Sequence, residues 1–244
     1  MINIISLINS PKRANKHNFN FTFFDAIDNK NVVSNYIFDK DLAQLFYGRQ
    51  LKNGEIGCTL SHFECISKFA NSALSDEWLI ILEDDVLPEK EFYQFLEEMK
   101  NVVASTEPEV FLLGHSKLNK NNNWIRLLKY PSYKNKKLAS FDFMISNSNY
   151  CGTVGYVINK SAAKKMLEQK NRIFWITDDW HLVENMGINV YHPKSPLVYE
   201  DLGSISETGN IVHCSHSFKK HAVRNIYIFI VENLKKIILN KRIR

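Results

Sequence analysis

Three features of the sequence predict an α/β fold, with a mixed, mainly parallel central sheet flanked by helices. The 244-residue chain starts with a β-branched apolar run at residues 1–8. A second apolar run, residues 79–82, is followed by three acids and Pro88, as is typical of a strand buried on both faces. Residues 58–70 and 89–104 carry apolar side chains at the three-to-four spacing of amphipathic helices.

The remaining segments extend this pattern of strands and helices. We expect a helix at residues 160–169, N-capped by Asn159 or Ser161, and another at residues 181–186. Residues 53–57 read as a turn, residues 29–51 as irregular, and residues 117–137 as a long surface loop. The expected strands are residues 1–8, 19–27, 78–87, 109–113, 150–159 and 188–199, the last broken at its prolines.

Composition and charge limit the compartment and the partners. Four cysteines without a CxxC pair, and no signal peptide, predict reduced thiols in the cytoplasm. No apolar run is long enough to span a bilayer. The formal net charge of +5 comes mostly from basic residues late in the chain. Because they are not gathered around aromatic platforms, nucleic-acid binding is disfavoured.

We predict two parts, a catalytic α/β domain at residues 1–210 and a basic amphipathic segment at residues 211–244. The apolar stripe and basic end of this last segment suit an anionic membrane interface. Packing of the same stripe on the domain, with a solvated basic end, is an equal alternative.

The acids Glu83, Asp84 and Asp85 directly follow the predicted central strand. Three adjacent carboxylates repel one another, and a divalent cation would relieve that repulsion. Alternate strand residues share a face, so we expect Glu83 and Asp85 to be ligands of Mg²⁺ or Mn²⁺. The alternative is an acidic turn that caps the helix beginning near Pro88.

A second acidic pair, Asp178 and Asp179, lies between Trp175 and Trp180. Carboxylates framed by large apolar rings have raised pKa values and are good candidates for general bases. The alternative is an Asp that caps the helix predicted at residues 181–186.

Two further groups suit an anionic ligand. Lys12 and Arg13 follow the first strand, where a nucleotide phosphate or base fits, although an ordinary basic surface loop is the alternative. Ser61 and His62 are predicted near the start of the helix at residues 58–70, where backbone amides favour anions. His62 is at least as readily explained as a capping or buried structural histidine.

Taken together, these segments resemble glycosyltransferase family 25. The resemblance rests on FFDAID (residues 23–28), GEIGCTLSHFECI (54–66), LIILEDDVLP (79–88), GTVGYVINKSAAKKML (152–167) and DDWHL (178–182), in this order. It implies a GT-A fold, a UDP-sugar donor, usually UDP-galactose, and a Mn²⁺ or Mg²⁺ ion. The implied metal ligands are Asp85 and Glu83. The implied donor-binding residues are Ser6, Leu7, Arg13, Asp25, Ala26, Ser61, His62, Glu83, Asp84, Gly155 and Tyr156.

The resemblance also implies transfer with inversion at the anomeric carbon, for which Asp179 is the first choice of base and Asp178 the second. The expected function is transfer of a hexose, galactose, from a UDP-sugar to a lipid-linked lipooligosaccharide or lipopolysaccharide glycan, at the inner face of the cytoplasmic membrane. The alternative is a non-catalytic carbohydrate-binding or scaffold protein that retains the fold. A metal-dependent phosphoesterase would need more histidine near the first acids, where His62 and His115 are the candidates.

Overall fold

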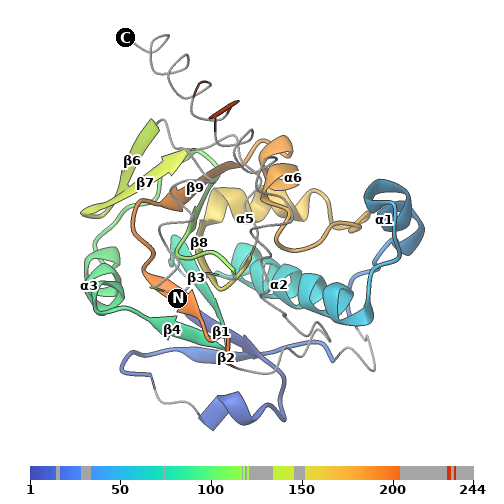
Figure 1. Ribbon diagram of the computed structural model, residues 1–244, viewed down its shortest axis with the longest axis horizontal. Coiled ribbons are helices and arrows are strands. Elements are labelled where there is room, and N and C mark those ends of the chain that lie inside the picture. The colour runs from blue at the N-terminus through green and yellow to red at the C-terminus, as the bar shows by residue number, and fades with distance from the viewer. Residues whose placement is uncertain are drawn as a thin grey trace.

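The computed structural model describes residues 1–14, 17–28, 34–73, 75–116, 118, 120, 134–145 and 152–203, together with residues 230, 231 and 234. Within these residues a central sheet lies between helices on its two faces (Figure 1). This agrees with the α/β fold predicted from the sequence. The segment at residues 211–244 and the aromatic part of the loop at residues 117–137 fall almost entirely outside the described residues.

The central sheet of the described residues has eight strands in the order β2-β1-β3-β8-β5-β9-β7-β6. β8 and β7 run against their neighbours, and the other six strands share one direction. The sheet is therefore mixed, as predicted, but four of its seven strand pairs are antiparallel, so it is not mainly parallel in its pairing. Its strands are β1 (Ile2–Ser6), β2 (Thr22–Asp25), β3 (Trp78–Glu83), β5 (Glu109–Leu112), β6 (Lys134–Leu138), β7 (Phe141–Ile145), β8 (Gly155–Asn159) and β9 (Asn189–Pro193).

The acidic stretch divides what was predicted as one strand. β3 ends at Glu83, a turn holds Asp84 and Asp85, and β4 (Val86–Pro88) follows. β4 pairs with β10 (Val198–Glu200) in a separate two-stranded sheet. The prediction of a single strand over residues 78–87 is therefore wrong, because the chain changes direction at the two aspartates.

The helices of the described residues are η1 (Pro11–Ala14), α1 (Lys40–Tyr47), α2 (Asn53–Asn71), α3 (Lys90–Met99), α5 (Lys160–Leu167) and α6 (Trp180–Asn185). α5 is capped by Asn159, whose side chain accepts from the Ala162 amide. Residues 53–57 are the first turn of α2, so the predicted turn there is wrong. The Lys52 amide donates to the Glu55 carboxylate at 2.8 Å, which holds this end of α2 in place.

Alternate residues of β3 face two different hydrophobic layers. Leu79 and Ile81 pack with α2, α5 and α6, whereas Ile80 and Leu82 pack with α3. Figure 1 shows α2, α5 and α6 on one side of the sheet and α3 on the other. By this alternation, the last residue of β3, Glu83, points toward the layer that contains α2.

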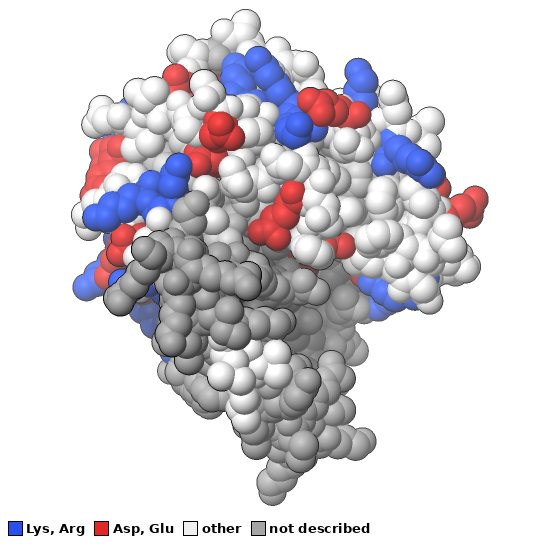
Figure 2. Space-filling model, turned by 90° about the horizontal axis from the view of Figure 1, so that it is seen from above, with Lys and Arg blue, Asp and Glu red and all other residues white. Residues whose placement is uncertain are grey.

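No helix among the described residues is long and apolar enough to cross a membrane. Figure 2 shows acidic and basic side chains of the described residues interspersed over the face seen from above. This mixture differs from the continuous basic stripe typical of nucleic-acid-binding surfaces.

Candidate active site

The turn after β3 is held by residues from the loop that follows β1. Ser6 and Ser10 both donate through their hydroxyls to Asp84 Oδ2, at 2.6 and 3.0 Å. Lys12 Nζ lies 3.4 Å from Asp84 Oδ1 and 3.4 Å from Asp85 Oδ2. Burial opposes the charge of Lys12, but the two carboxylates raise its pKa overall. The turn is thus a compact cluster with one cation placed between two acids.

Asp85 keeps one oxygen unused within this cluster. Its Oδ1 is buried and has no hydrogen-bond partner among the described residues. Burial raises the pKa of Asp85 to about 7, and the charge of Glu83 adds to this effect. A buried, unsatisfied carboxylate oxygen is costly unless a cation or a proton meets it. This oxygen therefore fits the Mn²⁺ or Mg²⁺ ion that the resemblance implies.

Glu83 points toward α2 and meets a hydroxyl and an imidazole there. The Thr153 hydroxyl donates to Glu83 Oε1. His62 Nε2 lies 3.7 Å from the same oxygen. Burial alone would raise the pKa of Glu83, but His62, Thr153 and Lys12 together lower it. The strand ends at Glu83 and Asp85 lies in the turn that follows, so their expected shared face stays a prediction.

His62 was predicted near the N-terminus of its helix, but it lies in the interior of α2, which begins at Asn53. Its side chain is only 2% exposed, and its Nδ1 is 2.9 Å from the hydroxyl of Tyr156 on β8. The neighbouring Ser61 donates to the carbonyl of Gly57 and accepts from the amide of Ile27. Neither residue therefore lies at a helix N-terminus, where free backbone amides could bind an anion.

Cys58 lies one helical turn before His62 on α2 and completes a group with Glu83. One donor atom from each of the three side chains lies within 4.8 Å of the other two, so the group could hold a metal ion. Burial raises the pKa of the Cys58 thiol well above its usual range, with Glu83 as the next cause. Cys58 and Cys65 are free thiols, as predicted, whereas Cys151 and Cys214 lie outside the described residues.

Asp178 and Asp179 precede α6 and have different surroundings. Asp179 caps the helix, since its Oδ1 accepts from the Leu182 amide at 3.1 Å. Its Oδ2 accepts from the hydroxyl of Tyr47 at 2.8 Å. Both oxygens of Asp179 are therefore engaged in holding α6 and α1.

The Asp178 carboxylate accepts from the amide of Gly152 through Oδ2 at 3.0 Å. Burial raises the pKa of Asp178, and the charge of Glu83 contributes to the increase. Asp178 thus lies near the acidic end of β3 as a largely buried carboxyl group whose pKa is raised. This is the environment expected of a general base.

Arg13 ties the end of β1 to the end of β2. Its guanidinium donates to the carbonyls of Ser6 and Leu7, at 2.8 and 2.9 Å, and to the Asp25 carboxylate at 2.5 Å. The Ala26 amide donates to the carbonyl of Ser6 at 2.9 Å. These residues hold the loop from which Lys12 reaches the acids. Their contact with a sugar donor stays a prediction.

Gly155 lies where β8 passes β3 most closely. A Cβ at this position would fall 2.8 Å from the side chain of Leu82. Gly155 therefore serves the packing of the sheet. Its role in donor binding stays a prediction.

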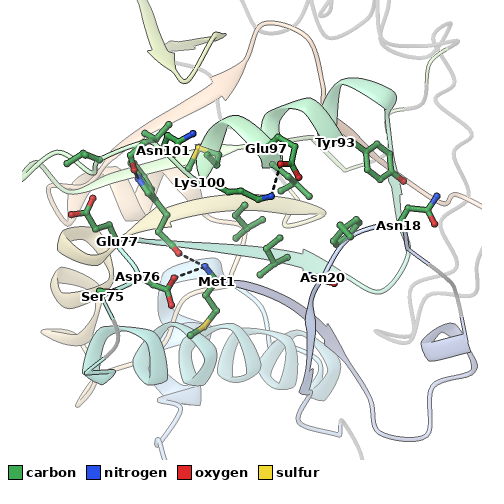
Figure 3. A pocket seen from close by; sticks show the side chains of 18 residues that line it. Met1, Asn18, Asn20, Ser75, Asp76, Glu77, Tyr93, Glu97, Lys100 and Asn101 are labelled. Carbon is green, nitrogen blue, oxygen red and sulfur yellow. Dashed lines mark hydrogen bonds and ion pairs between the residues drawn. The ribbon is translucent and has the colours of Figure 1, made fainter.

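A separate hollow of about 880 Å³ lies at the opposite end of β3 (Figure 3). Its wall combines the start of β1 and β3 with one side of α3. The Met1 amine pairs with Asp76, and Lys100 pairs with Glu97. The three acids of this hollow, Asp76, Glu77 and Glu97, outnumber its two cations, the Met1 amine and Lys100, so it is a poor site for a phosphate.

The site also contains residues that the sequence analysis did not select. Ser10 and Thr153 hold two of the acids, Tyr47 holds Asp179, and Cys58 lies beside His62. Cys58 alone left a sequence signal, since Cys-x₃-His on a helix puts both side chains on one face. The hydroxyls come from distant segments and leave no such pattern.

With this geometry in place, comparison with known proteins defines the class. Residues 1–181 match the model of glycosyltransferase family 25 (LPS biosynthesis protein), so the chain belongs to this family. It is 27% identical over 187 residues to a "Glycosyltransferase 25 family member" of Aedes aegypti. It is 27% identical over 159 residues to "Lipooligosaccharide biosynthesis protein lic2B" of Haemophilus influenzae, and 29% over 126 residues to "Lipooligosaccharide biosynthesis protein lex-1" of the same species.

These alignments cover 69%, 64% and 51% of this chain, respectively. They cover 28%, 55% and 39% of the three relatives, so the chain matches only part of each. Membership of the family confirms the resemblance stated from the motifs. The match to residues 1–181 includes both acidic pairs.

Proposed function

We propose that this protein is a GT-A glycosyltransferase that moves a hexose, galactose, from a UDP-sugar to a lipooligosaccharide or lipopolysaccharide glycan with inversion. Family membership and the names of the two Haemophilus influenzae relatives support this proposal. The observation that carries it is the acidic turn of Asp84 and Asp85, which meets Lys12 at one end of the sheet and has Glu83 and Asp178 beside it.

The chain's own residues would divide the work as follows. Lys12 offers a positive charge to the diphosphate at the end of β1. Asp178 accepts the proton of the acceptor hydroxyl as that oxygen attacks the anomeric carbon. Asp179 holds α6 and so positions its neighbour. A Mn²⁺ or Mg²⁺ ion on Asp85 would stabilise the charge of the departing diphosphate. We assign this ion to Asp85 because its Oδ1 is buried without a hydrogen-bond partner among the described residues.

The lipid-linked acceptor and the inner face of the cytoplasmic membrane belong to the same proposal. They are supported by the names of the two Haemophilus influenzae relatives and by the basic residues late in the sequence. A peripheral position would let a protein of this kind reach a glycan whose lipid is embedded in an anionic leaflet.

The test is transfer of radiolabelled galactose from UDP-galactose to truncated lipooligosaccharide, with Mn²⁺ present or removed by EDTA. Asp85→Asn should lose transfer and the metal-dependent stabilisation by UDP. Asp76→Asn, an exposed aspartate at the opposite end of β3, should behave as the unmodified protein. Transfer that survives both EDTA and Asp85→Asn would refute the metal assignment. No transfer from any UDP-hexose, with no stabilisation by UDP, would refute the function.

A further inference from the structure

We propose that Cys58, His62 and Glu83 form a binding site for one zinc-class ion, separate from the cation assigned to Asp85. The three side chains offer a sulfur, a ring nitrogen and a carboxylate oxygen, all within 4.8 Å of one another. This combination of ligands is typical of zinc and its chemical relatives in proteins. The proposal does not depend on the sugar transferred or on the acceptor.

Two rigid elements bring the three ligands together. Cys58 and His62 are four residues apart on α2, so they share one face of the helix. Glu83 ends β3 on the side of the sheet that α2 covers, as Ile81 does two residues earlier. A site built between a helix and a strand end is held by the packing of the core, which favours a defined geometry over a chance cluster of flexible side chains.

The strongest evidence is the orientation of His62. Its Nε2 is buried and has no hydrogen-bond partner among the described residues. At 3.7 Å from Glu83 Oε1, this nitrogen faces a carboxylate across a gap too long for a hydrogen bond. The other ring nitrogen contacts the hydroxyl of Tyr156 at 2.9 Å. Metal-binding histidines usually have such a second partner, which fixes the ring and points the free nitrogen at the metal.

The distances are close to those of an occupied site. Bond lengths of about 2.0–2.3 Å in a tetrahedral zinc site place the ligand atoms roughly 3.4–3.6 Å apart. The His62 to Glu83 separation of 3.7 Å already meets this value. The other separations are at most 4.8 Å, so binding of the ion requires a contraction of about 1 Å at most. Glu83 is 26% exposed, so a fourth position is open to water or an incoming oxygen ligand.

The ligand types also separate this site from the Asp85 site. Sulfur and imidazole favour Zn²⁺ and Co²⁺, whereas the oxygens of Asp85 suit Mg²⁺ or Mn²⁺. The two sites should therefore fill independently according to the metal supplied. Glu83 becomes a ligand of the zinc-class ion and leaves the donor cation to Asp85.

The experiment measures metal binding directly on the full, purified, metal-stripped chain. Zn²⁺ is titrated against a chromophoric chelator, and Co²⁺ is added separately to record the thiolate-to-cobalt charge-transfer absorption. We expect one Zn²⁺ per chain and a cobalt spectrum with a thiolate band. A tenfold excess of Mg²⁺ over Zn²⁺ should leave the bound Zn²⁺ in place. Displacement of Zn²⁺ by Mg²⁺, or a cobalt spectrum without the thiolate band, would overturn the proposal.

Matched variants locate the ion. Cys58→Ser and Glu83→Gln should each weaken Zn²⁺ binding at least tenfold, the lower range for disturbing a metal site. Cys65→Ser is the control, because Cys65 lies on the same helix but is buried against Asn3. It should keep both the affinity and the cobalt band. Unchanged binding in Cys58→Ser, or an equal loss in Cys65→Ser, would show that the ion binds elsewhere. Circular dichroism of each variant confirms that it is folded.

Discussion

The two aspartates before α6 should separate a structural role from a chemical one. Asp179→Ala removes the helix cap, worth about 1 kcal/mol. It also removes the charged acceptor of the Tyr47 hydroxyl, worth roughly 1.5–3 kcal/mol. The sum, about 2–4 kcal/mol, lowers Tm by roughly 5–12 °C in a chain of this size. Asp179→Asn keeps a good capping oxygen but not the second acceptor that Tyr47 uses, so it should cost less than Asp179→Ala, roughly 1.5–3 kcal/mol.

For Asp178 we expect the opposite pattern: little change in Tm and a large loss of galactose transfer. Asp178→Asn should change Tm little, because the amide oxygen still accepts from Gly152. It should lower galactose transfer by about 10²–10⁴-fold, the range for loss of a general base. Binding of UDP, followed by thermal shift, should persist. Full transfer by Asp178→Asn together with inactive, stably folded Asp179→Asn would refute this assignment and restore Asp179 as the base.

Three further predictions concern a glycine, a buried acid and a lysine. Gly152→Ala should cost about 2–4 kcal/mol in urea unfolding, since its φ is +102° and a Cβ would fall 2.2 Å from a hydroxyl. Gly48→Ala, with φ +66° and no atom within 4 Å, should cost only about 1–2 kcal/mol. Asp85 has a pKa of about 7, so the folded chain holds a proton that the unfolded chain has lost. Metal-free stability should therefore fall as pH rises from about 4 to 7 and change less in Asp85→Asn; equal slopes would contradict this. Lys12→Gln should raise the Kd for UDP by about 10–100-fold in calorimetry, and an unchanged Kd would remove Lys12 from the donor site.

The parts of the fold predicted from the sequence are those with a strong local pattern. The apolar run before Glu83 predicted β3, and Asn159 predicted the start of α5. Both depend on neighbouring residues alone. α1 was missed because it is only eight residues long and lies in a polar, aromatic stretch, with Ala43 as its one buried residue. β7 was missed because its apolar alternation is weak. Its partner β6 lies mostly in the segment predicted as a surface loop, and its other partner, β9, is far away in the sequence.

The first turn of α2 shows where a local rule failed. Two glycines at positions 54 and 57 are usual signs of a turn, yet both lie in the helix. The Arg49 guanidinium pairs with Glu55 at 2.6 Å, and Glu55 also accepts from the Lys52 amide. These tertiary and capping contacts outweigh a glycine penalty of about 1 kcal/mol per residue.

The candidate site was predictable in its acids and not in their orientation. The position of Asp85 and Glu83 at a strand end could be read from the sequence. The partners of Glu83, Thr153 and His62, could not, since they come from distant segments. Likewise His62 was assigned to a helix end because the start of α2 was placed too late.

The antiparallel direction of β8 has a consequence for how the acids of the site are held. Because β8 runs against β3, its entry lies beside the exit of β3, where the Glu83 amide donates to the carbonyl of Val154 at 3.1 Å. Gly152 and Thr153 therefore reach the acids from the start of a strand, whereas the other contributors follow the ends of strands. Pairing with β3 and β5 fixes the register of β8. That register therefore also fixes where the Gly152 amide meets Asp178 and where the Thr153 hydroxyl meets Glu83.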